Sequence, residues 1–377
     1  MKKLLYITKN FPPEIGGGLR RIEAIYNILL KNQKIELEVV TAQTNKNCEY
    51  KNVRYIKQLF FKDREKQEIT NFDSSKSSIK LFDKAFIGWF PNVIFHIIFR
   101  KYDYILAPCP HFTNVIIGFI YKLFRFFRPR LIIEYRDFFS FNPSFNESFK
   151  KKILKVLEKI IIKSSNYIIT TTDSMRSILN NYTNPGKIFL VRNYISRNDK
   201  QAVKNLKEMS FNKNYYHIGH VGKLNVGRNP VKVLTFLNNK ISDKNIALHF
   251  VGVNENERKM IIELCNKMKL DEKRLFFYET VDRKKSLQYM KSFDGLILIV
   301  NNIALIKDGY GIPGKLYDYI AVNNNIFLDK DGFNNICSEF NCNKKNEFDN
   351  FINFSINDNE TLDNVFNKVL DKIITND

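Results

Sequence analysis

The feature that most constrains the fold is an alternation of short apolar runs with helical stretches, which occurs twice along the chain. The first series runs from "LLYIT" to "KIFLVRN", and the second runs from "YHIGHVG" to "NNIFL". Strands that are apolar on both faces and are separated by helices predict parallel sheets covered on both sides. At 377 residues the chain is also long enough for two cores. We therefore predict an α/β chain of two doubly wound, Rossmann-like domains.

The polar stretch 196–214 separates the two series and is the predicted linker. It follows a first domain of residues 1–195 and precedes a second domain of residues 215–358. The amphipathic helix in the last segment, 359–377, is expected to pack back towards the first domain. Because parallel sheets bind ligands beyond the carboxyl ends of their strands, we expect the chemistry in a cleft between the domains.

The net charge of the chain indicates which class of partner it binds. Lys and Arg outnumber Asp and Glu by 60 to 39, a net charge of +21, which predicts an anionic partner such as nucleic acid, anionic lipid or a phosphorylated metabolite. The five cysteines match no zinc-binding spacing, so we expect reduced thiols, no metal site and a cytoplasmic chain. The apolar run at the amino terminus is too short for a signal peptide.

Two apolar segments raise the question of a membrane. Residues 85–99 fall short of the roughly 20 apolar residues that span a bilayer, so no crossing is expected. Residues 115–130 place Lys122, Arg125 and Arg128 among aromatic and aliphatic residues. That composition suits a helix at an anionic membrane surface, and it equally suits a buried helix with a basic end.

Three glycine-bearing loops could hold a ligand. "FPPEIGGGLRR" includes Gly17 and Gly18 before a helix whose free amides could meet an anion, although it lacks G-x-G-x-x-G and could be a flexible turn. "GHVGKLNVGRNP" carries Lys223 and Arg228, and two cations on such a loop suit a diphosphate, unless both are solvated. "DGYGIPGKLYDYIA" places Asp318 about one turn into a proline-started helix, where a carboxylate could accept from ribose hydroxyls.

In this order, these segments resemble bacterial glycosyltransferases of the GT-B fold, in particular the retaining family four, over almost the whole chain. "FPPEIGG" resembles the acceptor-side glycine loop and "EYRDFF" the segment after an inner strand. "TTTDSMRSIL" with "IFLVRNYIS" is similar to the helix and strand that close the first domain. "HVGKLNVGRNP" and "GIPGKLYDYIAVNNNIFL" are similar to the two donor loops.

The sequence also departs from the family pattern. Tyr194 replaces a glycine, and Asn324 and Ile326 replace the glycine and proline after the last helix. Asp318 stands where the ribose-binding Glu is usual, and Tyr310 stands where the first Glu of the E-x7-E pair is usual. The acidic E-x7-E pair of the family is therefore incomplete in this chain.

The resemblance implies a nucleotide-sugar donor in the second domain, an acceptor in the first, and transfer with retention and without a metal. A UDP- or GDP-sugar is the expected co-substrate, with no other cofactor. The expected donor-binding residues are Gly17, Gly18, Lys223, Arg228, Tyr310, Gly311, Ile312, Lys315, Leu316 and Asp318. The expected acceptor-binding residues are Arg20, Arg21 and His111, and the expected catalytic residues are His111 and Asp137.

Position along the strands supports the last two assignments, because His111 and Asp137 each follow a strand of the first series. His111 could instead be an ordinary loop histidine. Near Asp137, Glu134 and Arg136 could pair with each other. His217, His220 and His249 alternate with apolar residues and are expected to be structural.

The leading hypothesis is transfer of a sugar to a glycan or an undecaprenyl-diphosphate-linked acceptor in capsule, O-antigen or exopolysaccharide synthesis, at the inner face of the membrane. One alternative is a nucleotide-sugar 2-epimerase of the same fold. Another is a non-catalytic basic protein that binds membrane or nucleic acid. The chain has no P-loop, recognition-helix or RNP-type motif, so nucleic acid is not an expected partner.

Overall fold

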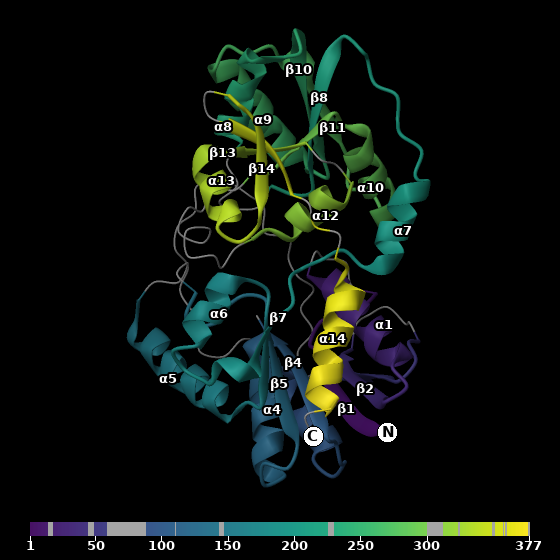
Figure 1. Cartoon of the computed structure of the whole chain (residues 1–377), viewed down its shortest axis with the longest axis vertical. Coiled ribbons are helices and arrows are strands. Elements are labelled where there is room, and N and C mark those ends of the chain that lie inside the picture. Colours follow the sequence, from purple (N-terminus) through teal and green to yellow (C-terminus); the bar gives the residue numbers. More distant parts are fainter. Residues whose placement is uncertain are drawn as a thin grey trace. The chain divides into compact units, whose positions relative to one another are not determined.

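The computed structural model describes residues 1–13, 18–43, 49–58, 88–109, 111–142, 147–224, 230–299, 312–322, 325–348, 351–356, 358 and 360–375. These residues form two compact units (Figure 1). The first unit holds the described residues up to Asn193 together with the C-terminal helix. The second unit holds those from Tyr194 to Thr361.

The first unit is built on a parallel sheet with the strand order β3-β2-β1-β4-β5-β6-β7. Its strands are β1 (Lys2–Ile7), β2 (Ile35–Ala42), β3 (Val53–Ile56), β4 (Tyr104–Cys109), β5 (Arg130–Tyr135), β6 (Tyr167–Thr170) and β7 (Ile188–Leu190). All six residues of β4 are buried, which explains the continuous apolar run in the sequence. The carboxyl ends of these parallel strands share one edge of the sheet.

The helices of the first unit cover both faces of this sheet. They are α1 (Leu19–Lys31), α3 (Phe90–Ile97), α4 (Phe112–Phe124), α5 (Phe149–Ser164), α6 (Asp173–Leu179), the 3-10 turn η1 (Pro185–Lys187) and α14 (Leu362–Thr375). The steps from β1 to β2 and from β4 to β5 run in opposite directions along the sheet. Right-handed crossovers therefore place α1 and α4 on opposite faces. On the α1 face, α14 packs against α1, and Lys34 pairs with Asp371 at 2.8 Å.

The second unit has a mostly parallel sheet with the order β11-β10-β8-β12-β13-β15-β14, and β9 pairs with β10. Its strands are β8 (Tyr215–Val221), β9 (Lys240–Ile241), β10 (Lys244–Val251), β11 (Leu275–Tyr278), β12 (Gly295–Ile297), β13 (Ile326–Asp329), β14 (Cys342–Glu347) and β15 (Phe351–Ile356). The strands β14 and β15 form an antiparallel edge that the sequence pattern did not predict. The order of the strands reverses direction between β8 and β12, and such a switch point is where α/β sheets bind ligands.

The helices of the second unit are α7 (Arg197–Asn205), α8 (Val231–Thr235), the 3-10 turn η2 (Phe236–Asn238), α9 (Glu255–Lys267), the 3-10 turn η3 (Glu272–Arg274), α10 (Arg283–Ser292), α12 (Gly314–Val322) and α13 (Lys330–Cys337). Two clusters of buried apolar side chains flank the sheet, and alternate residues of β10, Ile246, Leu248 and Phe250, belong to one of them. None of the described helices combines the length and the apolar character needed to cross a membrane.

The stretch 196–214, expected as a linker, contains α7. The Ser196 side chain caps this helix by accepting a hydrogen bond from the Asp199 amide. The helix packs against α10 and α12 although Val203 is its one buried residue. Its surface is otherwise polar, which is why composition alone indicated a linker.

Two buried histidines link β8 and β10. His217 Nδ1 lies 2.8 Å from His249 Nε2, and the other ring nitrogens lie near the Asn212 carbonyl (2.8 Å) and the Tyr278 hydroxyl (3.1 Å). The carbonyl can only accept, so His217 Nε2 carries a proton and His217 Nδ1 accepts from His249. This satisfies each nitrogen with both rings neutral. Burial, with His217 adding to it, lowers the pKa of His249 to about 3.

The second unit should lose stability in acid because of His249. An unfolded histidine takes up a proton near pH 6.5, whereas the folded ring stays neutral until about pH 3. Stability from this group is therefore complete above pH 6.5 and falls below it by about 1.4 kcal/mol per pH unit. Hydrogen exchange of β10 amides between about pH 6 and 4 should show this slope for the parent and a shallower slope for His249→Phe. Equal slopes would contradict the assignment.

Candidate functional site

The β8 loop of the second unit depends on two glycines. Gly222 directly follows β8 with φ +111°, and its amide donates to the Val251 carbonyl at 2.6 Å. Gly252 follows β10 with φ +88°, and a Cβ built there would lie 3.5 Å from the Gly222 Cα. L-residues rarely adopt these backbone conformations. Glycine at both positions therefore lets the ends of β8 and β10 adopt positive φ values side by side.

The side chain of Lys315, in the first turn of α12, crosses over Gly222. A Cβ built at Gly222 would lie 2.6 Å from the Lys315 Cε and 2.8 Å from its Nζ. That ammonium lies 3.0 Å from His220 Nε2 and 3.3 Å from the Lys223 carbonyl oxygen. The second and third glycine loops predicted from the sequence thus meet in this unit, through Lys315.

His220 fixes the position of the Lys315 ammonium. The ring is buried on β8, and its Nδ1 lies 3.2 Å from the Ile297 carbonyl oxygen on β12. A carbonyl only accepts, so Nδ1 carries the proton and Nε2 offers its lone pair to the ammonium. His220 is structural, as expected, and it also orients a cation at the switch point, which its place in an apolar strand did not reveal.

A buried glutamate supports the same loop from α9. Glu257 forms a capping box with Asn254: each side chain accepts a hydrogen bond from the backbone of the other. Burial raises the pKa of Glu257, while amide hydrogen bonds from Asn254 and Leu224 and the charges of Lys223 and Lys315 act in the opposite direction. Glu257 therefore ties the start of α9 to the residues that follow Gly222.

Asp318 has a different environment from the one expected. Its two carboxylate oxygens accept from the Arg283 guanidinium at 2.7 and 3.0 Å, and Arg283 also donates to Asp199 at 2.8 and 2.9 Å. Asp318 is 7% exposed. This network joins α12, α10 and α7, so Asp318 helps to pack these helices together, and its contact with a ribose stays a prediction.

The other predicted donor residues divide into three groups. Ile312 and Leu316 are buried in the apolar core, so their side chains pack the start of α12 against that core. Lys223 has an exposed side chain, and its backbone carbonyl oxygen lies 3.3 Å from the Lys315 ammonium. Gly17, Arg228, Tyr310 and Gly311 lie outside the described residues.

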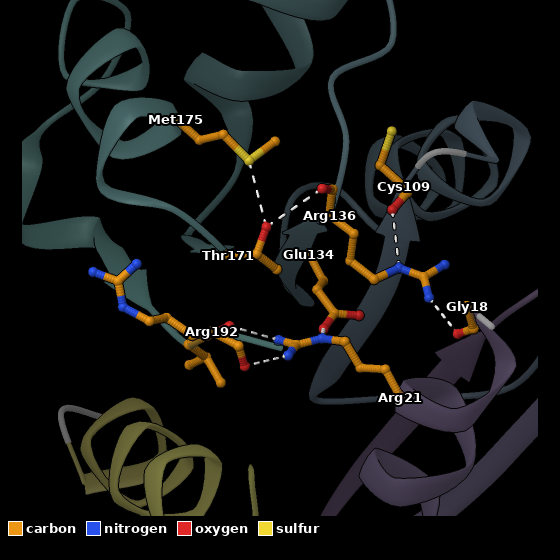
Figure 2. Close-up of polar contacts among 9 residues, drawn as sticks. Gly18, Arg21, Cys109, Glu134, Arg136, Thr171, Met175 and Arg192 are labelled. Atoms are coloured by element: carbon orange, nitrogen blue, oxygen red, sulfur yellow. Dashed lines mark hydrogen bonds and ion pairs between the residues drawn. The ribbon is translucent and has the colours of Figure 1, made fainter. Parts of the chain in front are cut away.

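In the first unit, Arg21 is buried and engaged within the protein (Figure 2). Its guanidinium donates to Glu134 at 2.6 Å and to the carbonyl oxygens of Arg192 (2.7 Å) and Val191 (2.9 Å). The three acceptors lie on β5 and just after β7, so Arg21 ties α1 to these strands. Glu134 therefore pairs with Arg21, not with Arg136 as the sequence allowed, and a contact between Arg21 and an acceptor stays a prediction.

Arg136 holds the start of α1 instead. Figure 2 shows its guanidinium between the carbonyl oxygens of Gly18 (2.6 Å) and Cys109 (3.3 Å). Gly18 is the N-cap residue of α1, and the neighbouring Arg20 is exposed. Of the two arginines expected to bind an acceptor, Arg20 is therefore the one placed at the surface.

His111 and Asp137 follow neighbouring strands. His111 is the N-cap residue of α4, and its Nε2 lies 3.0 Å from the Asn10 side-chain amide after β1. Asp137 is exposed after β5. Asn10 carried no sequence signal, yet it brings the β1 and β4 ends together at the point where the strand order reverses.

Comparison with known proteins gives partial matches. No protein-family model matches the chain. The chain is 21% identical over 306 residues to the uncharacterized glycosyltransferase MJ1069 of Methanocaldococcus jannaschii, a match that covers 78% of this chain and 73% of that protein.

Three solved structures with similar folds each match at least 85% of this chain. Anabaena HepE in complex with UDP-glucose has a TM-score of 0.52 at 12% identity, covering 85% of this chain and 79% of that one. Sucrose-phosphate synthase of Thermosynechococcus elongatus has a TM-score of 0.53 at 13% identity, covering 98% and 90%. The N-terminal domain of Candida albicans trehalose-6-phosphate phosphatase has a TM-score of 0.59 at 10% identity, covering 85% and 80%. The predicted fold class, two Rossmann-like α/β domains of GT-B type, is confirmed.

Gly222 and Gly252 should be intolerant of side chains. Gly222→Ala and Gly252→Ala each place an L-residue at a strained φ, and each should lower the free energy of unfolding by about 1–3 kcal/mol. Gly314→Ala is the matched control, since a Cβ there meets nothing within 4 Å, and it should leave stability unchanged or slightly raised. Urea denaturation of the three variants measures this, and a neutral Gly222→Ala would contradict the close approach.

Substitutions of the buried Arg21 and of the exposed Arg20 should have different effects on the stability of the first unit. Arg21→Met leaves Glu134 buried without its partner and should cost about 3–5 kcal/mol, whereas the exposed Arg20→Met should cost under about 0.5 kcal/mol. The single tryptophan, Trp89, is buried in the first unit, so its fluorescence during urea denaturation reports on that unit. Equal stability of the two variants would refute the structural role of Arg21.

Proposed function

We propose that this protein is a glycosyltransferase that moves a sugar from a UDP- or GDP-sugar to a glycan or an undecaprenyl-diphosphate-linked acceptor. The observation that carries the proposal is the Lys315 ammonium held over Gly222 at the carboxyl end of β8. Retention at the anomeric carbon, a role in surface polysaccharide synthesis and a place at the inner face of a membrane are part of the proposal. They rest on the resemblance in the sequence.

The β8 edge has the properties that a diphosphate requires. The Lys315 side chain crosses over Gly222 from the first turn of α12, so the amino terminus of this helix, the end that attracts anions, lies close to the end of β8. Lys315 adds a fixed positive charge, and the exposed side chain of Lys223 adds a second close by. Charge-assisted hydrogen bonds from such donors stabilise a leaving diphosphate as charge develops on it, without a metal.

The donor class is also supported by the comparisons. HepE, which shares the fold, was solved with UDP-glucose, and MJ1069 is described as a glycosyltransferase. Both identities are low, so they support the class of donor and leave the sugar open. The proposal also assigns Arg228, Tyr310 and Gly311 to the donor site, together with Lys223 and Lys315.

Acceptor chemistry is assigned to the strand ends of the first unit. His111 carries an imidazole and Asp137 an exposed carboxylate after neighbouring strands, and either group can accept a proton from an attacking hydroxyl. Arg20 offers an exposed cation for a phosphate-bearing acceptor. We propose no covalent nucleophile on the protein.

The donor site is tested by the affinity for nucleotide sugars. Lys315→Met should weaken binding of UDP- or GDP-sugars at least about tenfold, because charge-assisted hydrogen bonds to the diphosphate are lost. Lys244→Met removes the same charge from an exposed position at the amino end of β10, at the opposite edge of the sheet, and should bind as the parent does. Isothermal titration calorimetry of the three proteins is the measurement.

Two results would count against this function. The proposal fails if no nucleotide sugar binds the parent protein, or if Lys315→Met binds as tightly as Lys244→Met. Conversion of a UDP-N-acetyl sugar to its 2-epimer without an acceptor would identify the epimerase alternative instead, because a transferase leaves the configuration at C2 unchanged.

A further inference from the structure

Exposed hydrophobic side chains gather on one part of the protein. Apart from Met1, every large hydrophobic side chain that is exposed among the described residues belongs to α3 or the turn after it, to α4 or the turn after it, or to α5, and none belongs to the second unit. On α3, α4 and the turns after them they are Phe95, Phe99, Leu123, Phe124, Phe126 and Phe127. A concentration of this kind marks an interaction surface, since isolated exposed apolar residues are normally scattered.

Helix α5 carries a second apolar stripe of its own. Phe149, Ile153, Val156 and Ile160 are 77%, 46%, 59% and 51% exposed. Their spacings of four, three and four residues place them on one face of the helix. Leu154 and Ile161, which are buried in the protein, lie on the opposite face. The outer stripe therefore contributes nothing to the core of the first unit.

Lysines border this stripe. Helix α5 contains six lysines and one acidic residue, Glu158, which is fully buried and accepts hydrogen bonds from Ser140. Of these lysines, Lys152 and Lys163 are exposed on the side of the stripe. An apolar face flanked by lysines is the pattern of a helix lying in the interface of an anionic bilayer.

The turn after α4 exposes two phenylalanines at a conformational cost. Phe126 and Phe127 have φ values of +51° and +61°, a region that glycine or asparagine adopts more readily. Their side chains are 85% and 57% exposed, so packing offsets little of that cost. Arg125 and Arg128 accompany them in the sequence. Stability of the fold does not account for phenylalanine at these two positions.

Contacts bring the three helices together at their carboxyl ends. Lys122 of α4 donates from Nζ to the Ser164 carbonyl at the end of α5, at 2.6 Å. Tyr121 donates from its hydroxyl to the Arg100 carbonyl just after α3, also at 2.6 Å. The exposed apolar residues of α3, α4 and α5 therefore belong to neighbouring segments. This finding resolves the question of residues 115–130: α4 is buried along most of its length and exposed at its basic end.

We propose that this α3–α5 surface docks on an anionic lipid bilayer, with the outer stripe of α5 and the turn after α4 inserted to the depth of the headgroups. Lysine and arginine along both segments complement anionic headgroups, while the apolar side chains leave water. The proposal rests on the proposed function and deepens it, because it assigns the place at a membrane to a surface that contains no residue of the donor site. It would place the first unit, where the acceptor is assigned, at a membrane that holds lipid-linked glycans.

The test is flotation of the full chain with vesicles of phosphatidylcholine alone and of phosphatidylcholine mixed with phosphatidylglycerol. The parent should bind the mixed vesicles more tightly, and salt should weaken that binding. Replacing Phe149, Ile153, Val156 and Ile160 by serine should weaken it at least about tenfold at unchanged charge. Lys152→Gln with Lys163→Gln should weaken it about fivefold per lysine, whereas Lys259→Gln with Lys267→Gln on exposed α9 positions should have little effect.

A second variant separates binding from folding. Phe126→Asn with Phe127→Gly relieves the left-handed backbone, so the melting temperature should be unchanged or higher while vesicle binding falls. The proposal is overturned if the parent does not bind the mixed vesicles or if the stripe variants bind as the parent does. It is also overturned if light scattering shows a dimer that the α5 variant dissociates, since a second copy would then cover the face. Nucleotide-sugar affinity, measured in parallel, reports separately on the donor site.

Discussion

The absence of a side chain at Gly222 is the constraint on which the candidate site of the second unit depends. With hydrogen at this position, the Lys315 side chain can cross from α12, and the backbone can adopt the positive φ at which the Gly222 amide donates to the Val251 carbonyl at the end of β10. His220 Nε2 then accepts a hydrogen bond from the Lys315 ammonium, and Glu257 links the residues after Gly222 to α9. A single methyl group at Gly222 would occupy the space of the Lys315 Cε, so the geometry of the cation and of the loop is set together.

The first unit uses its charges in a different way. Arg21 and Arg136 are also cations near the carboxyl ends of parallel strands. Their guanidinium groups, however, donate to carbonyl oxygens and to a buried carboxylate of the protein. These contacts fix the start of α1 and the ends of β5 and β7. We assign acceptor chemistry in this unit to His111, Asp137 and Arg20, which were also expected from the sequence.

The sequence predicted the architecture because the periodicity of strands and helices is a local property. Two series of apolar runs indicated two α/β units, and glycines at strand ends indicated the loops after β1 and β8. Lys315 was expected as a donor-binding residue from the family resemblance, and it lies in the first turn of α12. The same local reasoning overlooked α7, whose surface is polar apart from Val203, and the antiparallel edge of β14 and β15.

Side-chain partners were harder to predict because they join residues far apart in the chain. Arg21 and Glu134 are separated by 113 positions, and Arg283 and Asp318 by 35. A buried ion pair and a solvated charge look alike in sequence, so Arg21 was assigned to an acceptor and Asp318 to a ribose. His220 looked structural for the same reason, since its partner Lys315 lies 95 residues away.

The central claim is that the β8 edge of the second unit binds the diphosphate of a nucleotide sugar. Hydrogen–deuterium exchange with and without UDP-sugar tests it most directly, because it locates the ligand on the chain. We expect slower exchange in peptides that cover residues 219–224 and 312–318, with the amino ends of β8 and β10 unchanged. Binding of the ligand with no protection at these two segments, or with protection confined to the first unit, would contradict it.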